Sequence, residues 1–191
     1  MYKIAKENLS ALFREISKTQ ELYLPIKTAG KVNFGAWTED CEVDIDTLKS
    51  VKSPKDAFFP QSENLYTCTT EDKKIKITPE ELKSQDFVVF GMKGCDVQGV
   101  EVLDKVFLSN PVDSFYQARR NHGTIVAMAC SEPEDSCFCK VFGIDCANPE
   151  GIADVAVWNT PDYLYWNALT PKGEKLTAAV SELLEESDET A

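Results

Sequence analysis

Residues 86–96 read Asp-Phe-Val-Val-Phe-Gly-Met-Lys-Gly-Cys-Asp and place a short apolar run just before a glycine-flanked cysteine. A run of β-branched and aromatic residues, ended by Gly91, predicts a buried strand. Residues 96–108 follow with apolar side chains at helical spacing, and residues 124–129 (Thr-Ile-Val-Ala-Met-Ala) form a second apolar run. Strand, helix and strand in this order predict two parallel strands joined by a right-handed crossover.

Further elements are expected on both sides of this unit. The patterns predict a helix over 6–18, a β-hairpin over 21–37, a polar surface excursion over 38–82, a helix over 113–121, strands over 154–158 and 163–166, and an amphipathic helix from 171. The expected fold class is therefore α/β, with an open, partly parallel mixed sheet, flanking helices and an N-terminal helix–hairpin. An α+β arrangement is the alternative.

The overall composition sets limits on the class of protein. With 191 residues, 43% of them hydrophobic, the chain fits one domain with a real core. We expect an N-terminal arm over about 1–82, a core over about 83–180 and an acidic tail over 181–191. A net charge of −12 argues against nucleic-acid binding and suits docking on a basic face of another protein. The sequence shows neither a membrane-spanning run nor a secretory signal, so we expect a cytoplasmic protein.

The seven cysteines are unevenly distributed. Cys41 and Cys68 lie apart in the first part of the chain, whereas five others crowd the centre: Cys95, Cys130, Cys137, Cys139 and Cys146. In a reducing compartment such a group indicates metal ligation, redox chemistry or buried thiols rather than a disulfide scaffold.

Four of these cysteines are expected to converge on one metal site. Cys95 and Cys130 each follow one of the two predicted parallel strands, so both thiols should emerge at the same carboxyl edge of the sheet. Cys137 and Cys139 lie in the loop that begins at Cys130 and can fold back over this edge. Four thiolates at one point are what an iron–sulfur cluster requires. Zinc is the alternative, although C-x6-C-x-C is not a zinc-ribbon spacing.

The neighbours of these cysteines suit a negatively charged cluster. Gly91 and Gly94 allow close approach of the backbone, and Lys93 adds a cation. The helix that begins beside Cys95 should present free N–H groups and lower the pKa of that thiol. Phe138 could exclude water from the site. Cys146 is close enough in sequence to replace a ligand, although we interpret it as a spare thiol.

Other kinds of site find little support in the sequence. His122 is the only histidine, so a catalytic Cys–His pair, a Ser-His-Asp triad or a multi-histidine metal site would all depend on it. The glycines of residues 91–94 lack the spacing of nucleotide-binding loops. Beside electron transfer, a zinc-stabilised interaction module without redox function remains open.

Several segments resemble a family of anaerobic electron-transfer subunits that comprises the sulfhydrogenase beta subunit and the anaerobic sulfite reductase A subunit. Residues 87–96 are similar to its FGVRPCD segment, residues 113–121 to its DPYYxxRRE stretch, and residues 130–139 to its CxEP…CFC element. The hairpin near residue 25 and residues 172–174 fall in comparable places. The likeness covers most of the chain.

The resemblance implies a non-catalytic subunit that relays electrons within a larger reductase or hydrogenase. It also implies one [4Fe–4S] cluster on the four matched cysteines, with other redox subunits or a ferredoxin-type protein as partners. Two departures stand out. Residues 93–94 are Lys-Gly where the family has Arg-Pro, and the family's C-x2-C-x2-C-x3-C-P runs are absent from these 191 residues. We therefore expect either a truncated form or a single-cluster relative that has a separate partner.

Overall fold

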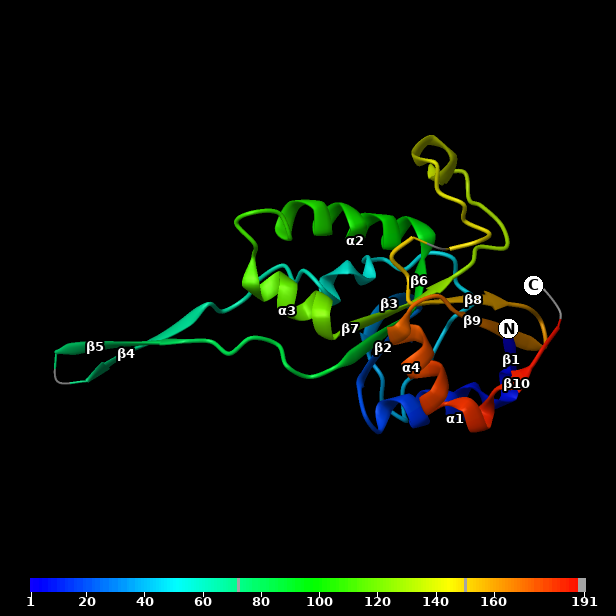
Figure 1. Ribbon diagram of the computed structural model, residues 1–191, viewed down its shortest axis with the longest axis horizontal. Coiled ribbons are helices and arrows are strands. Elements are labelled where there is room, and N and C mark those ends of the chain that lie inside the picture. Colours follow the sequence, from blue (N-terminus) through cyan, green and yellow to red (C-terminus); the bar gives the residue numbers. More distant parts are fainter. Residues whose placement is uncertain (72, 150, 189–191) are drawn as a thin grey trace.

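The computed structural model describes residues 1–71, 73–149 and 151–188, and it shows an eight-stranded sheet with helices on both faces (Figure 1). In chain order the elements are β1 (Tyr2–Ala5), η1 (Lys6–Asn8), α1 (Leu9–Ser17), β2 (Glu21–Thr28), β3 (Lys31–Ala36), η2 (Pro54–Ala57), β4 (Tyr66–Glu71), β5 (Lys74–Pro79), β6 (Phe87–Lys93), α2 (Gly94–Phe107), α3 (Ser114–His122), β7 (Gly123–Met128), η3 (Cys139–Phe142), β8 (Val155–Asn159), β9 (Tyr163–Ala168), α4 (Pro171–Ala179), η4 (Ser181–Leu183) and β10 (Glu185–Glu186).

The sheet is mixed, which confirms the predicted α/β class. Its strand order is β10-β1-β9-β8-β7-β6-β2-β3. The four strands β2, β6, β7 and β8 are parallel to one another, and the outer strands pair antiparallel. The predicted parallel pair is β6 and β7, joined through α2 and α3. Their carboxyl ends therefore share one edge of the sheet.

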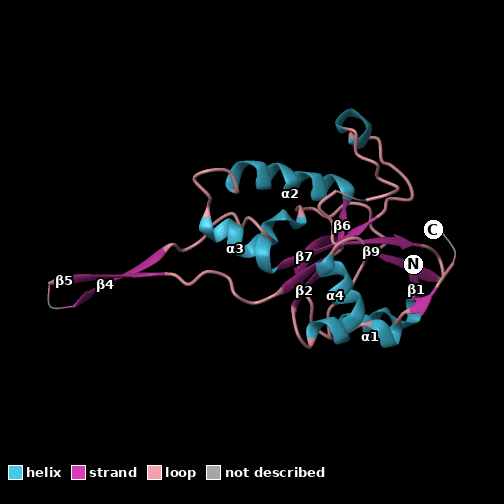
Figure 2. Ribbon diagram, viewed as in Figure 1, coloured by secondary structure: helices cyan, strands magenta, loops and turns pink. Residues whose placement is uncertain are grey.

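The sheet separates two hydrophobic cores. Helices α1 and α4 cover one face, while α2, α3 and η2 cover the other (Figure 2). Strand β6 is buried on both sides because Val88 and Phe90 face one core while Phe87 and Val89 face the other. Burial on both faces explains why its sequence is a continuous apolar run rather than an alternating one.

The N-terminal helix and hairpin form as expected. Helix α1 buries Leu12, Phe13 and Ile16, three of the residues on its apolar stripe. The hairpin of β2 and β3 turns at Ala29 and Gly30, which both have positive φ angles of 51° and 74°. Two adjacent residues of this kind are what a tight hairpin turn needs, and glycine adopts the conformation without strain.

The prediction that strand β6 stops at Gly91 was wrong: the strand continues to Lys93 through a bulge between Phe90 and Met92, with Gly91 at a φ of 92°. The edge strands β1 and β10 were not predicted, because each is too short to show an alternating pattern. Also not predicted were η2 and the hairpin of β4 and β5, which lie within the surface excursion over 38–82.

The β4–β5 hairpin extends away from the body as an arm (Figure 1). Its strand β5 is exposed along its whole length, with Ile75 and Ile77 at 72% and 64% exposure. Phe58 is fully buried and anchors residues 38–82 to the body. Phe59 stacks on Phe107 with ring centroids 4.5 Å apart, yet it stays 42% exposed.

The predicted division of the chain cuts through this sheet. Strands β1 and β2 come from the expected arm over about 1–82 and pair with β9 and β6 of the expected core over about 83–180, and β3 joins the sheet through β2. Within the expected tail over 181–191 lie η4 and β10, while residues 189–191 fall outside the described residues. The domain boundaries stay a prediction. None of the helices in the described residues is both long and apolar enough to span a bilayer.

Candidate metal centre

A cavity of about 230 Å³ opens beside the carboxyl ends of β6 and β7. We call it the cysteine cavity, because all four cysteines expected as ligands line it. The other residues of its wall come from β2, β3, β6, α2 and the segment before η2, and the full lining is Pro25, Val32, Phe34, Ile45, Thr47, Leu48, Lys49, Ser50, Ser53, Gly91, Lys93, Cys95, Asp96, Cys130, Cys137 and Cys139. The structure thus brings together thiols that are up to 44 residues apart, since 139 − 95 = 44.

Two of these cysteines are placed by the parallel strands. Lys93 ends β6 and pairs in register with Met128, which ends β7. Helix α2 begins directly after β6, so Cys95 lies in its first turn. Cys130 follows β7 by two residues, and its N–H donates to the carbonyl of Cys146 at 2.8 Å. The crossover geometry predicted from the sequence therefore accounts for Cys95 and Cys130.

The other two cysteines lie in the segment of residues 130–149, which we call the cysteine loop. A salt bridge of 3.1 Å from Lys49 Nζ to Glu134, together with a hydrogen bond from Lys49 to Ser136, ties this loop to the segment before η2. The N–H of Glu134 donates to Cys137 Sγ at 3.3 Å. The carbonyl of Cys139 accepts from the N–H of Ile144 at 2.9 Å and so closes the turn around η3.

Four other predicted residues occupy different positions around the cavity. Gly91 and Lys93 lie in its wall, as expected. Gly94 is not among the lining residues and instead packs against the cysteine loop, where an added Cβ would lie 3.3 Å from Ile144 Cγ2. Phe138 is 64% exposed and is not part of the wall. Its expected role in excluding water stays a prediction.

Cys146 lies closer to the site than its interpretation as a spare thiol suggested. Its side chain forms a hydrogen bond with Cys139, and its charge acts on the thiols of both Cys130 and Cys139. It does not line the cysteine cavity. A fifth thiol thus interacts with two of the four proposed ligands.

The donor set fits an iron–sulfur cluster in kind, because the four converging donors are all thiols, the ligands that such clusters take. In this structure the four thiols lie farther apart than the ligands of a metal-bound site. Within residues 1–71, 73–149 and 151–188, no three Cys, His, Asp or Glu side chains are close enough together to hold a metal ion. The thiols therefore surround the cavity rather than meet at its centre.

Burial governs the protonation of these thiols. It raises the pKa of Cys130 to about 11, while the ammonium of Lys93 acts in the opposite direction. The pKa of Cys95 is also raised, first by burial of its thiol in the cavity wall and then by the carboxylate of Asp96. The expected lowering by the helix end was therefore wrong: the backbone N–H groups of Cys95 and Asp96 oppose the increase but do not outweigh burial.

Lys93 is a cation that interacts with two of these thiols, those of Cys95 and Cys130. Burial lowers the pKa of its ammonium, and the negative charges of Cys130 and Cys95 partly restore it. A half-buried cation beside several thiols offsets the charge of a thiolate-bound cluster. Sequence reasoning found Lys93 but missed Lys49, which lies more than 40 residues before the cysteines and shows no motif.

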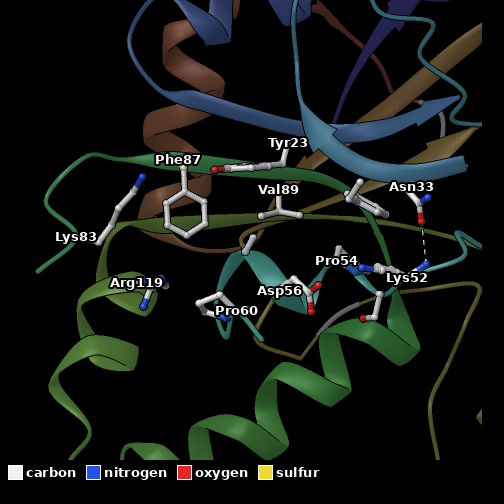
Figure 3. Close-up of a pocket in the computed structure, with 13 residues that line it drawn as sticks. Tyr23, Asn33, Lys52, Pro54, Asp56, Pro60, Lys83, Phe87, Val89 and Arg119 are labelled. Atoms are coloured by element: carbon white, nitrogen blue, oxygen red, sulfur yellow. Dashed lines mark hydrogen bonds between the residues drawn. The ribbon is translucent and has the colours of Figure 1, made fainter. Parts of the chain in front are cut away.

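A second hollow, of about 350 Å³, lies between the sheet and η2 (Figure 3). Tyr23, Phe87 and Val89 of the sheet face Pro60 and η2 across it. Two of its cations are paired within the protein: Lys83 Nζ lies 2.6 Å from Glu21, and Arg119 pairs with Glu63, while Lys52 is a third cation in the wall. This hollow contains none of the clustered cysteines, so the cysteine cavity is the stronger candidate for a metal centre.

Sequence similarity links the chain to a known protein. Sulfhydrogenase 2 subunit beta of Pyrococcus furiosus is 31% identical over an alignment of 149 residues that covers 76% of this chain. The chain is similar to a sulfhydrogenase beta subunit. The resemblance drawn from the cysteine-bearing segments is thereby confirmed for the sulfhydrogenase beta subunit. The chain spans 42% of that subunit's length. No family model and no solved structure matches the chain.

Proposed function

We propose that this chain is an electron-transfer subunit or domain that holds one [4Fe–4S] cluster on Cys95, Cys130, Cys137 and Cys139. The observation that carries the proposal is the cysteine cavity, whose wall contains these four thiols at the carboxyl edge of a parallel sheet. The similarity to a protein named as a sulfhydrogenase subunit supports it. The chain would act in the cytoplasm, within a larger reductase- or hydrogenase-type complex.

When bound, the cluster would accept and release one electron at a time, and the surrounding residues would set its reduction potential. The first turn of α2 directs its free N–H groups toward the thiolate of Cys95. Lys93 offsets negative charge at the carboxyl end of β6. The positive φ of Gly91 lets the bulge in β6 pass close to the cavity wall beside Pro25. The N–H groups and Lys93 would each stabilise the more negative, reduced state.

The partners would be other redox subunits or a ferredoxin-type protein. The remaining cysteines, Cys41, Cys68 and Cys146, lack the spacing of a second cluster, so electrons would enter and leave through a redox centre outside these 191 residues. The charge of −12 favours a partner with a basic face.

The decisive experiment is anaerobic purification or reconstitution, followed by metal analysis. The expected product is brown, contains iron and acid-labile sulfide in equal amounts, and gives a reversible electron paramagnetic resonance signal on reduction. A colourless protein with stoichiometric zinc would favour the zinc-stabilised interaction module instead.

Ligand identity is tested by single substitutions. Cys95→Ser, Cys130→Ser, Cys137→Ser and Cys139→Ser should each lose the cluster or make it labile, because a hydroxyl binds iron more weakly than a thiolate. Cys41→Ser and Cys68→Ser are matched controls and should keep full iron content; Cys68 lies in the exposed arm. Full cluster content in Cys95→Ser would refute the assignment, and loss in Cys146→Ser would transfer one ligand position to Cys146.

A further inference from the structure

The cysteine loop carries three large apolar side chains on its outer surface. Phe138 is 64% exposed, Val141 75% and Phe142 71%. They occur within five residues, around the short helix η3, at the end of a segment that projects from the body (Figure 1, yellow). We call these three residues the apolar tip. Single exposed apolar residues are ordinary on protein surfaces, but three in one projecting turn indicate a contact surface.

The apolar tip is covalently part of the proposed cluster site. Phe138 stands between Cys137 and Cys139, and Val141 and Phe142 share η3 with Cys139. Any protein that covers the apolar tip therefore lies next to two of the four proposed ligands. The β4–β5 arm also exposes apolar residues, but it extends from the body and contributes none of the cavity wall.

The surroundings of the apolar tip are acidic. Glu132 and Asp135 are exposed and form no ion pair with any residue in the described parts of the chain. Glu134 is neutralised by Lys49, and Lys140 is the cation of this turn. An apolar centre with a charged rim is the usual composition of a protein–protein contact surface.

We propose that the apolar tip is the docking surface for the redox partner, and that the partner is a cofactor-bearing subunit with an apolar socket and a basic rim. The inference rests on the proposed function and specifies where electrons cross. Docking then depends mainly on apolar burial at Val141 and Phe142, and the acidic rim adds orientation and speed of association. Binding through the apolar tip should persist at high salt, whereas binding through the overall charge of −12 alone would weaken as salt screens the charges.

The test uses the complex purified anaerobically from its source through a tag on this chain, with the partner identified by its flavin, haem or iron–sulfur content. Binding of that purified partner to the cluster-loaded chain is then measured by titration calorimetry. Val141→Ser and Phe142→Ser should each raise the Kd at least about tenfold. Val51→Ser, an equally exposed valine at 64%, is the matched control and should leave the Kd within about twofold.

Two further readouts make the result specific. Reduction of the cluster by dithionite, a small reductant that needs no docking, should be unchanged in both variants, while reduction by the partner should slow. Wild-type Kd values in Val141→Ser and Phe142→Ser, with the cluster intact, would overturn the docking surface and leave the proposed function standing. An iron-free chain whose binding to the redox subunit is still lost in these variants would support the docking surface and refute the proposed function.

Discussion

At the scale of single residues, Lys93 connects the fold with the proposed chemistry. It ends β6, lies in the cavity wall and has a half-buried ammonium that acts on the thiols of Cys130 and Cys95. Lys93→Met should lower the reduction potential of the cluster by on the order of 50 mV, because the reduced state loses a nearby positive charge. Lys31→Met, at the exposed turn between β2 and β3, is the control. Equal potentials for Lys93→Met and wild type in an anaerobic redox titration would contradict the role of Lys93.

A second residue-scale prediction concerns Asp86 and His122. Asp86 accepts a hydrogen bond from His122 at 2.7 Å, and this bond is the main reason why the pKa of Asp86 is lowered. A carboxyl with a lowered folded-state pKa adds stability above its unfolded pKa of about 3.9, and loses that contribution as the pH falls through the folded value. Asp86→Asn should therefore reduce the free energy of unfolding at pH 7 by less than about 1 kcal/mol, since the pair is half exposed.

Urea unfolding at pH 7 and pH 3 checks this sign. The difference between Asp86→Asn and wild type should shrink at pH 3, because this pH lies below the unfolded-state pKa and the stabilisation is lost as the pH falls toward the lowered folded-state pKa of Asp86. If the difference in the free energy of unfolding instead grew as the pH was lowered, the Asp86 carboxylate would not stabilise the protein through its hydrogen bond with His122.

At the scale of elements, α4 approaches the sheet closely at Gly173, where only a residue without a side chain fits. A Cβ on Gly173 would lie 1.9 Å from the carbonyl oxygen of Asp154, which is backbone and cannot move aside. Gly173→Ala should therefore destabilise the protein by about 3 kcal/mol or more, because α4 must shift away from its core. The measurement is thermal or urea unfolding.

Gly99 in α2 is a matched control for Gly173. The nearest atom to its added Cβ is the flexible side chain of Lys55, at 2.8 Å. Alanine also gains about 1 kcal/mol over glycine inside a helix, which offsets the displacement of Lys55. Gly99→Ala should stay within about 1 kcal/mol of wild type. If both variants lost the same free energy of unfolding, the close approach of α4 to the backbone of Asp154 would not be what makes Gly173 necessary.

The sequence predicted elements well where one physical pattern dominates. The helical stripe of α1, the apolar run of β6 and the turn at Ala29–Gly30 each leave a clear periodic or conformational signal. The β4–β5 arm was missed although β5 alternates lysine with isoleucine over residues 74–77, and this alternation covers no core because the whole of β5 is exposed. The positions of Cys95 and Cys130 just after the two parallel strands β6 and β7 predicted that these thiols converge. The salt bridge from Lys49 to Glu134, which ties the cysteine loop to the segment before η2, is a tertiary contact that no local pattern encodes.

At the scale of the whole molecule, the described strands of residues 2–36 and 87–168 form one sheet. Strand β2 pairs with β6, and α1 packs into the same core as α4. A fragment that begins at residue 83 would expose the edge of β6 and lose Leu12, Phe13 and Leu24 from that core. Such a fragment, residues 83–191, should not fold by itself.

The full chain should correspondingly unfold in one cooperative step. Far-ultraviolet circular dichroism and tryptophan fluorescence are expected to give coincident transitions, because Trp166 lies in the shared core. Two separate transitions, or a folded fragment of residues 83–191, would instead support the boundary near residue 82 as a true domain border.

The β4–β5 arm has a consequence for how this chain can be altered. Its strands pair only with each other, while β2 on one side of it and β6 on the other are neighbours in the main sheet. A protease that cut the arm would divide the chain, but both pieces would stay joined by the sheet and its two cores. The arm is thus a point where the polypeptide can be broken, extended or rejoined without loss of the fold. It is the natural position for inserting a reporter peptide, or for expressing the protein as two complementary halves.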